Sequence, residues 1–520
     1  MSKARPAHRA GDPFDQTLSG WHPGIGSADA DWLGSRDTAI GRVRDLVQNE
    51  PWGQSAVDAK AVSAVGRGWI WSSRPSAKSL GLDATSQAYT DLATSCEAAF
   101  ETWATDPAFR GDYQRMLPYG LQLWLAALSL YRDGEALALI NYEPGRQDGF
   151  GYKTTLQLID PDRLSNPDNR PDDETYRGGV ELDAEGRPVA VHIRRAHPGD
   201  VNGFGFQAAE WDRIEMRESW GRPRVIHLVD RDRVDQHRGV SRLVAGLKRM
   251  KVLQSYAEAE LKTAALNATV FATIYADGNS EYLTEALGDT KALDSLIGEQ
   301  NKFYDTADPR FAGSRAVRVF PGDRVDMHTQ GRNNAAFGDF TTVLLQSLAA
   351  GLGLTYEQLT KDFSRTNYSS ARAAMIEAWR TVERERKLIQ DLFADQILLA
   401  VLEEAYEAGR LALPDGAPAF WDAPAAYIRG RWIAPERGAI DPVKERVGGR
   451  MAVGNFEKTY EDLAAEGGRD FDEVVASSVR VLKKLEASGL KPETIAAVLG
   501  LAHQTLDSTP EQAPKVPKTA

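Results

Sequence analysis

The sequence predicts an α+β protein made of several modules, and three observations support this prediction. The chain has 520 residues and a mass of 57.1 kDa, which is more than one hydrophobic core usually holds. Apolar residues recur at helical spacing up to residue 132 and again from residue 240 onward. Between these stretches apolar residues alternate at period two, and turn-forming residues separate the runs, as expected of strands.

The N-terminal part is expected to consist of an arm and three helices. Residues 1–35 are rich in Gly, Pro, Ser and Asp without a sustained period, which predicts a poorly ordered arm. The first helix is expected over 36–50, because apolar positions share one face and Pro51 ends the run. A second helix is expected over 89–103. A third, over 113–132, is apolar nearly all round, which predicts burial on most of its sides.

Strands are expected in the middle of the chain. Apolar residues alternate with other residues over 137–139, 156–158 and 189–193, and another strand is expected over 224–230. The segment 160–177 is rich in Pro and Asp, which predicts long loops in this β-rich insert.

The C-terminal half is expected to be mainly helical. A helix over 240–270 would be about 45 Å long at ~1.5 Å per residue, and residues 280–330 mix helix and strand. Further helices are expected over 339–352, from Thr355 with a capping box to Gln358, over 370–409, and from Asp441 and Asp470 onward. The polar run 361–368 separates two of them. The charged run 383–387 is interpreted as a solvated face, and a Pro- and Lys-rich tail follows Thr505.

Charge and composition exclude several classes of protein. The formal net charge of −12 disfavours tight wrapping of nucleic acid, so any contact with DNA is expected to be local or weak. The single cysteine, Cys96, cannot form an intrachain disulfide or a thiolate cluster, and its place on an apolar stripe predicts a core residue. No apolar stretch reaches the ~20 residues of a bilayer span, and no secretory signal is visible.

The sequence contains none of the common motifs of nucleotide-binding, zinc or serine enzymes. We therefore predict a protein without enzymatic activity, with no catalytic residue, no metal and no cofactor. The best acid–base candidates are His227, Asp230 and His237, and a metal-dependent hydrolase that uses this neighbourhood is the alternative.

A second group of candidate ligands is carboxylic. Asp160 and Asp162 belong to an acidic segment whose oxygens are ligands of the kind that divalent cations take. Their spacing matches no known loop signature, so a solvated acidic loop is the prediction.

Six strings of residues together resemble one protein family. They occur in the order Arg42-Val-Arg-Asp-Leu-Val-Gln-Asn49, Val65-Gly-Arg-Gly68, Val225-Ile-His-Leu228, Gln236-His-Arg-Gly-Val240, Asn367-Tyr-Ser-Ser-Ala-Arg-Ala373 and Asp441-Pro-Val-Lys-Glu445. In order and approximate spacing they resemble the portal proteins of lambda-type tailed bacteriophages. The resemblance covers roughly residues 36–475.

The resemblance implies a ring, typically of twelve copies, at one vertex of a phage capsid. Double-stranded DNA would pass through it non-specifically during packaging and ejection. The implied partners are other copies of the chain, the large subunit of the terminase, a head-completion or adaptor protein, and the major capsid or scaffold protein, with no membrane. The implied location is the virion, assembled in the cytoplasm of a bacterial host. A plain scaffold or adaptor ring without a DNA path is a third possibility.

The resemblance also implies a multi-domain portal fold with wing, stem, clip and crown. The implied modules are a flexible arm (1–35), wing and first stem helix (36–159), clip (160–228), second stem helix (229–275), wing (276–360), tunnel loop (361–369), long helix and wing return (370–440), helical crown (441–502) and disordered tail (503–520).

The implied tunnel loop supplies candidates for contact with DNA phosphates. They are five polar side chains, Lys361, Ser364, Arg365, Thr366 and Asn367. The alternative is that Arg365 pairs with Asp362 or with a neighbouring subunit, and that the loop is only a connector.

Overall fold

The computed structural model describes residues 17, 20–200, 210–268, 271–275, 290–306, 324–328, 336–364, 368–438 and 441–488. The chain divides into two compact units, one of Met1–Val244 with Leu352–Ala520 and one of Ala245–Gly351. Each unit contains helices and strands, which confirms the predicted α+β class. Among the described helices, none is both long and apolar enough to cross a membrane.

The N-terminal helices of the first unit are α1 (Ala28–Asn49), α2 (Pro51–Ala64), α3 (Ala77–Leu80), α4 (Gln87–Ala104) and α5 (Tyr119–Asp133). The arm predicted over 1–35 is wrong for its last part, because α1 begins at Ala28. Ser27 caps this helix by accepting from the Ala30 amide, and the Trp32 indole N–H donates to the Gly239 carbonyl at 2.9 Å. Contacts distant in sequence thus extend the helix beyond its local apolar pattern.

Two other helix predictions need correction. Pro51 ends α1 as expected, but it also occupies the first turn of α2, which the sequence analysis missed. Helix α5 begins at Tyr119, because the Asp112 carboxylate accepts from backbone amides of the preceding turn. Its predicted burial on most sides is confirmed, and only Leu121 and Leu125 are exposed.

The centre of the first unit is a three-stranded antiparallel sheet in the order β3–β2–β8, made of β2 (Glu135–Tyr142), β3 (Thr154–Ile159) and β8 (Val225–Val229). All three strands were expected, β2 and β3 from the alternation of apolar residues. Both faces of β2 are covered, which explains why its sequence is a nearly unbroken apolar run.

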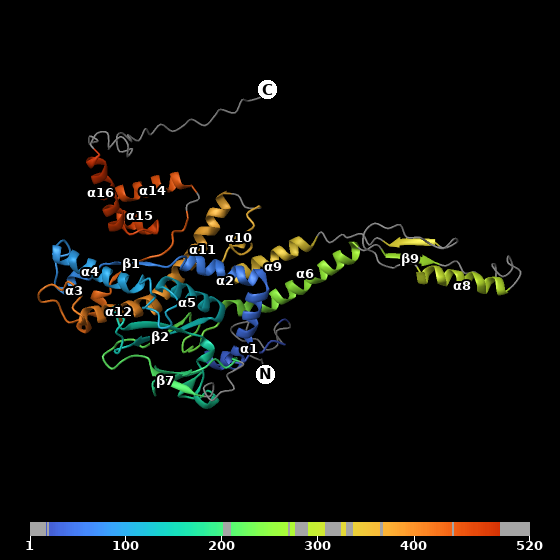
Figure 1. The fold of residues 1–520 in the computed structure, drawn as a ribbon, viewed down its shortest axis with the longest axis horizontal. Coiled ribbons are helices and arrows are strands. Elements are labelled where there is room, and N and C mark those ends of the chain that lie inside the picture. The colour runs from blue at the N-terminus through green and yellow to red at the C-terminus, as the bar shows by residue number, and fades with distance from the viewer. Residues whose placement is uncertain are drawn as a thin grey trace, which may run out of the picture. The chain divides into compact units, whose positions relative to one another are not determined.

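A second antiparallel sheet lies on one face of β2. Its order is β4–β5–β6–β7, from β4 (Tyr176–Arg177), β5 (Val180–Leu182), β6 (Pro188–Arg194) and β7 (Trp211–Glu215). Leu137 and Leu139 of β2 pack against Val180, Val191 and Ile193 of this sheet. Figure 1 shows β2 between the sheet that contains β7 and the helices α5 and α12.

The other face of the central sheet packs on helices. Ala136, Ala138 and Ile140 share a core with α4, α5 and the buried residues that follow Ile389. Cys96 is fully buried in this core, as predicted, and burial raises the pKa of its thiol to about 12. The thiol is therefore a core group and not a nucleophile.

The long C-terminal helix is continuous, as predicted, but it contains a π-helical segment between two α-helical parts. It consists of α11 (Tyr368–Ile389), a π-helical segment (Gln390–Ala394) and α12 (Asp395–Glu407), and it follows α10 (Tyr356–Thr360) with its predicted capping box. The charged run 383–387 is not simply a solvated face. Glu385 is only 2% exposed, because it pairs with Lys60 of α2.

The remaining elements of the first unit are one strand from its N-terminal part and several elements from its C-terminal part. Strands β1 (Ile70–Ser73) and β11 (Gly430–Ile433) form an antiparallel pair, preceded by α13 (Pro424–Tyr427) and followed by α14 (Pro442–Gly454), α15 (Tyr460–Glu466) and α16 (Phe471–Ala487). Asp441 and Asp470 cap α14 and α16 as predicted. The Pro- and Lys-rich tail lies outside the described residues.

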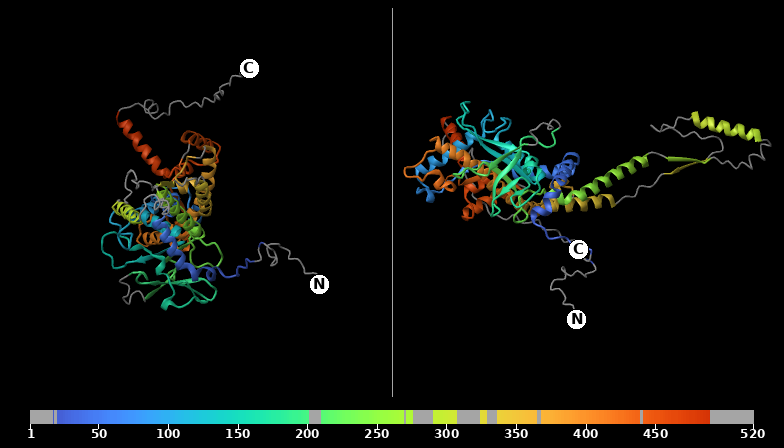
Figure 2. Two further views of the ribbon diagram at one scale, coloured as in Figure 1. Left: turned by 90° about the vertical axis from the view of Figure 1, so that its right-hand side faces the viewer. Right: turned by 90° about the horizontal axis from the view of Figure 1, so that it is seen from below.

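The second unit contains α6 (Leu247–Ala268), β9 (Phe271–Tyr275), α8 (Thr290–Thr306), β10 (Arg324–His328) and α9 (Ala336–Leu352). Helices α6 and α9 lie side by side, with Tyr256 against Phe337 and Phe340, and β9 pairs with β10 (Figures 1 and 2). The helix expected from residue 240 begins at Leu247, because a 3-10 helix, Arg242–Gly246, precedes it.

Candidate functional site

The residues proposed for chemistry lie around one carboxylate that the sequence analysis did not select. Glu135 opens β2 and its side chain is 0% exposed. It accepts from Arg36 at 2.7 Å, from His227 at 2.9 Å and from the Gly239 amide at 2.9 Å. Arg238 donates to both of its oxygens, with a shortest distance of 2.7 Å. We call these five groups the Glu135 network.

The centre of the network is a carboxylate, and both oxygens of Glu135 accept hydrogen bonds from the surrounding groups. Burial alone would raise the pKa of Glu135, but the charges of Arg238 and Arg36 outweigh it, so this pKa lies well below its ordinary value. Burial lowers the pKa of His227 despite the opposing effect of Glu135. A neutral imidazole that donates to a fully occupied carboxylate holds a structure together rather than performing acid–base chemistry.

Arg238 also connects the network to the loops of the second sheet. It donates to the carbonyls of Pro161 at 2.9 Å and Leu164 at 2.8 Å, and also to that of Gly178. Only an arginine provides enough donors in a fixed fork for these partners. The Gln236–Val240 string, which supports the family resemblance, thus joins β2 to the insert.

The same string also holds α1 in place. The ring of His237 contacts the Asp29 carboxylate through Nδ1 at 2.7 Å, and its backbone amide donates to the same side chain at 3.0 Å. Gly239 has no room for a side chain, because a Cβ atom there would meet the carbonyl of Gly134. The close approach of the Gly134 backbone therefore explains why position 239 is a glycine.

A second buried ion cluster lies on α2, α5 and α11. Lys60 and Glu385 pair at 2.7 Å with side chains 4% and 3% exposed, and the Tyr131 hydroxyl lies 3.2 Å from the same carboxylate. Burial lowers the pKa of Lys60 although Glu385 opposes the shift. Asp230 pairs with Arg384 and Arg242 nearby.

The predicted hydrolase neighbourhood does not form a single site. His227 bonds Glu135, His237 bonds Asp29, and Asp230 pairs with two arginines. Each group is therefore occupied by a different partner. The geometry gives no support to the metal-hydrolase alternative.

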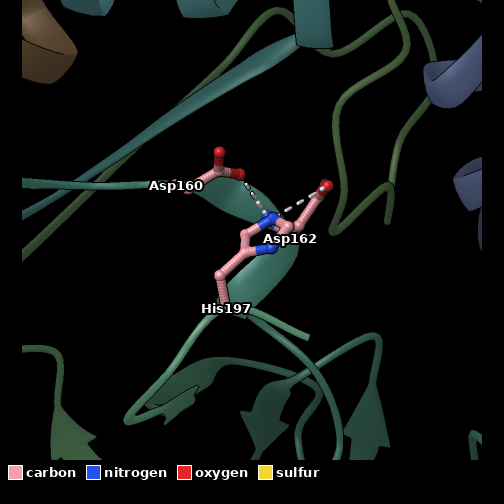
Figure 3. A group of neighbouring side chains, drawn as sticks. All are labelled: Asp160, Asp162 and His197. Atoms are coloured by element: carbon pink, nitrogen blue, oxygen red, sulfur yellow. Dashed lines mark hydrogen bonds and ion pairs between the residues drawn. The ribbon is translucent and has the colours of Figure 1, made fainter. Parts of the chain in front are cut away.

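The three groups that do converge are Asp160, Asp162 and His197, whose ligand atoms lie within 4.8 Å of one another (Figure 3). The nearest approach of the imidazole to Asp162 is 3.6 Å. Arg44 of α1 reaches both carboxylates, and the charges of Asp133, Asp162 and Asp160 raise its pKa although burial opposes them. The guanidinium already balances this acidic group, so it has the features of an ion-pair cluster.

The predicted tunnel loop is only partly described. Lys361 is exposed and adopts a left-handed conformation (φ 59°) at the C-cap of α10, and Ser364 is exposed with its amide donating to Asp362 at 2.9 Å. Arg365, Thr366 and Asn367 lie outside the described residues. Of the five candidates, the two described ones, Lys361 and Ser364, are therefore exposed.

Comparison with known proteins decides the family. Residues 14–386 match the family described as phage portal protein, lambda family. This chain belongs to the lambda family of phage portal proteins. The match includes the Glu135 network. Membership of a structural family agrees with the prediction of a protein without enzymatic activity.

Relatives in this portal family extend the likeness beyond residue 386. The chain is 30% identical to the portal protein of Escherichia phage N15 over 504 residues, which cover 94% of this chain and 92% of that one. It is 28% identical to portal protein B of Escherichia phage lambda over 505 residues, with the same coverage. The neck of an empty GTA particle, a solved structure, is 14% identical with a TM-score of 0.44, covering 85% of this chain and 97% of that one.

Sequence reasoning found the Gln236–Val240 string but missed its partners. Glu135 and Arg36 lie 103 and 202 positions before Arg238, so no local pattern links them. One signal was present, because an isolated glutamate begins an otherwise apolar strand directly after Asp133-Gly134. A charge at the start of a buried strand indicates a paired charge.

Proposed function

We propose that copies of this chain form a closed ring at one capsid vertex and that double-stranded DNA passes along the axis of the ring. Membership of the portal family is the observation that carries the proposal. We take twelve copies as the number, as the sequence resemblance implies. The location that follows is the virion, after assembly in the host cytoplasm.

Exposed apolar stripes support self-association. Helices α14, α15 and α16 contain no buried residue. On α14 the exposed apolar residues repeat every fourth position, at Val443, Val447 and Met451. On α16 the exposed apolar residues Val475, Val479 and Leu482 follow helical spacing. Helices with such stripes are stabilised when a neighbour covers them, and a ring supplies identical neighbours at every interface.

The charge of the chain is compatible with a conduit for DNA. A net charge of −12 disfavours strong electrostatic binding of DNA. Each phosphate that a Lys or Arg neutralises strengthens the salt-dependent binding, and stronger binding opposes the sliding of DNA. A few cations at the tunnel loop, Lys361 and Arg365, are enough for transient contact. We propose that the 361–369 loop faces the passage.

The remaining module roles are proposals too. Residues 36–159 and 276–360, apart from α9, would belong to the wing and 441–502 to the crown, and 160–228 would be the clip that meets the terminase large subunit and later the head-completion protein. For the stem we favour a different pair from the one expected. Helix α5 is part of the core of the first unit, whereas α6 packs on α9 in the second, so α6 and α9 are the better stem pair.

The native mass of the purified protein tests the ring. We expect an assembly whose mass is a multiple of 57.1 kDa, with a central hole wide enough for duplex DNA in negative-stain images. A monomer at high concentration would contradict the proposal. A closed ring without an open axis would support the adaptor-ring alternative instead.

A further inference from the structure

Helix α14 exposes an apolar stripe that is bordered by arginines. Val443, Val447 and Met451 lie four positions apart on one face of the helix and are 72%, 41% and 58% exposed. Arg446 and Arg450 follow the two valines by three positions, so they lie at the border of the same face. Both arginines are exposed. We call these five residues the α14 surface.

The opposite face of α14 packs on α15 of the same chain. A Cβ atom at Gly449 would lie 3.0 Å from the side chain of Leu463, so the two helices approach each other closely there. The half-buried residues of α14 lie on this face, and they are Glu445, Gly449, Ala452 and Val453. The α14 surface is therefore directed away from the helix on which α14 packs.

Helix α16 exposes a second stripe, and this one is bordered by carboxylates. We call it the α16 surface, and its members are Asp472, Val475, Val479, Leu482 and Glu486. They follow one another at intervals of three, four, three and four positions, which is the spacing of residues that pack against a partner helix. All five are exposed, whereas the half-buried residues Phe471, Val474, Ser477 and Leu485 lie on the other side of the helix.

The first half of α16 has an excess of carboxylates. Asp470 caps the helix and Asp472 lies in its first turn, whereas the basic residues of the helix begin at Arg480. Burial and the charges of Asp470 and Glu461 raise the pKa of Asp472, although Arg74 opposes the shift. An additional cation near Asp472 would therefore stabilise this end of the helix.

We propose that the α14 surface of one subunit packs on the α16 surface of the next subunit, with Arg446 and Arg450 near Asp472. The occupant of each surface is thus a second copy of this chain. The proposal rests on the ring proposed above and names two surfaces that meet within it. Each apolar stripe removes the other from water, and the opposite charges at the borders align the two helices.

Charge favours contact between these two different surfaces over contact between two α14 surfaces. Arg446 and Arg450 lie near the middle of α14, so two antiparallel α14 helices would bring arginines against arginines. Contact between α14 and α16 replaces this repulsion with attraction. Two different surfaces of one chain form a head-to-tail interface, and interfaces of this type generate a ring when the rotation between subunits closes.

Chemical cross-linking of the full-length protein tests the contact. Cys96 is fully buried and burial raises the pKa of its thiol, so cysteines added at the surface are the ones that react. The double variant Val447→Cys with Val475→Cys is treated with a bifunctional maleimide that has a short spacer. We expect a ladder of cross-linked oligomers on a denaturing gel. Each single variant should run as a monomer, and so should the control Val447→Cys with Arg480→Cys, whose second cysteine lies outside the α16 surface.

The outcomes separate this proposal from the portal role. A double variant with the native mass of the wild-type ring but without a ladder would overturn the α14–α16 contact and leave the ring intact. Cross-linking of Val447→Cys alone would show that two α14 surfaces meet, which would also overturn the contact. A wild-type protein with the native mass of a monomer would overturn the ring itself.

Charge reversal gives an independent readout. Arg446→Glu should raise severalfold the protein concentration below which the ring dissociates, because it places a carboxylate near Asp472. The double variant Arg446→Glu with Asp472→Arg should restore the wild-type concentration. The control Lys78→Glu makes the same change of charge at an exposed lysine of α3, outside both surfaces, and should behave as the wild type. Wild-type dissociation of Arg446→Glu, or no recovery in the double variant, would overturn the proposed contact.

Discussion

The guanidinium of Arg238 donates to the carboxylate of Glu135 from both Nε and Nη2, and the two side chains are 3% and 0% exposed. Two buried opposite charges cost free energy on leaving water, and their attraction and hydrogen bonds offset that cost. The pair is useful mainly because it fixes three segments relative to each other: α1, the start of β2 and the loops of the second sheet.

Arg238→Met is expected to destabilise the protein by about 3–5 kcal/mol, because it leaves a carboxylate buried with fewer donors. Arg238→Lys should restore only part of this loss, since one ammonium cannot reach Glu135 and three carbonyls together. The measurement is the free energy of unfolding from urea titration followed by tryptophan fluorescence. The control Arg187→Met removes an exposed arginine and should change little. Equal effects of the buried and exposed substitutions would contradict the account.

His227 should make the protein less stable as the pH falls below neutrality. Burial keeps the pKa of His227 below its unfolded value of ~6.5, so only the unfolded chain takes up this proton near pH 6. The stabilisation is complete above pH ~6.5 and is lost below it. His227→Gln keeps a donor for Glu135 and cannot be protonated, so its unfolding free energy should fall less between pH 7 and pH 5. The exposed His22→Gln should keep the wild-type slope, and a wild-type slope in His227→Gln would contradict the prediction.

The ionisation of Glu97 should change the stability of the protein with pH in the opposite direction to that of His227. Burial raises its pKa to about 7, helped by Asp470 and Asp472 and opposed by the Ser73 amide, which donates at 2.6 Å. A carboxyl with a raised pKa stabilises the fold while it is protonated, so its contribution is present below pH ~4.5 and is lost as the pH rises through 7.

Glu97→Gln keeps the acceptor for the Ser73 amide and removes the ionisation. We expect it to be more stable than the wild type by about 1–2 kcal/mol at pH 8, after allowance for solvent screening, and equal to it at pH 4.5. Thermal unfolding at the two pH values measures this. Glu101→Gln, exposed on the same helix, is the control. A stability gain that is the same at both pH values would argue against ionisation as the cause.

Much of the fold could be predicted from local patterns, because each helix of the core presents a periodic apolar face. The stripe through Cys96 located α4, and the alternation around Leu137 located β2. Boundaries were less certain where distant contacts decide them. Helix α1 extends to Ala28 because Trp32 bonds Gly239, a residue more than two hundred positions away.

The charged core could not be predicted for the same physical reason. Glu385 belongs to a run that has the composition of a solvated face, and its contacts with Lys60, 325 positions earlier, and with Tyr131 accompany its burial. Residue type indicates that a charge needs a partner, whereas topology determines which one it finds. The candidate loop at Lys361 was located by family resemblance and polar composition, which say nothing about the direction of individual side chains.

Lys361 and Arg365 provide the most direct test of the DNA passage. Replacing both with alanine removes two positive charges from every subunit, and transient phosphate contacts depend on charge more than on side-chain shape. We expect Lys361→Ala with Arg365→Ala to form rings of wild-type mass but to package DNA severalfold less in an in vitro assay. Lys361→Arg with Arg365→Lys keeps both charges and should package close to the wild-type level. If the alanine variant assembles and packages normally, the loop is only a connector and the passage is lined by other residues.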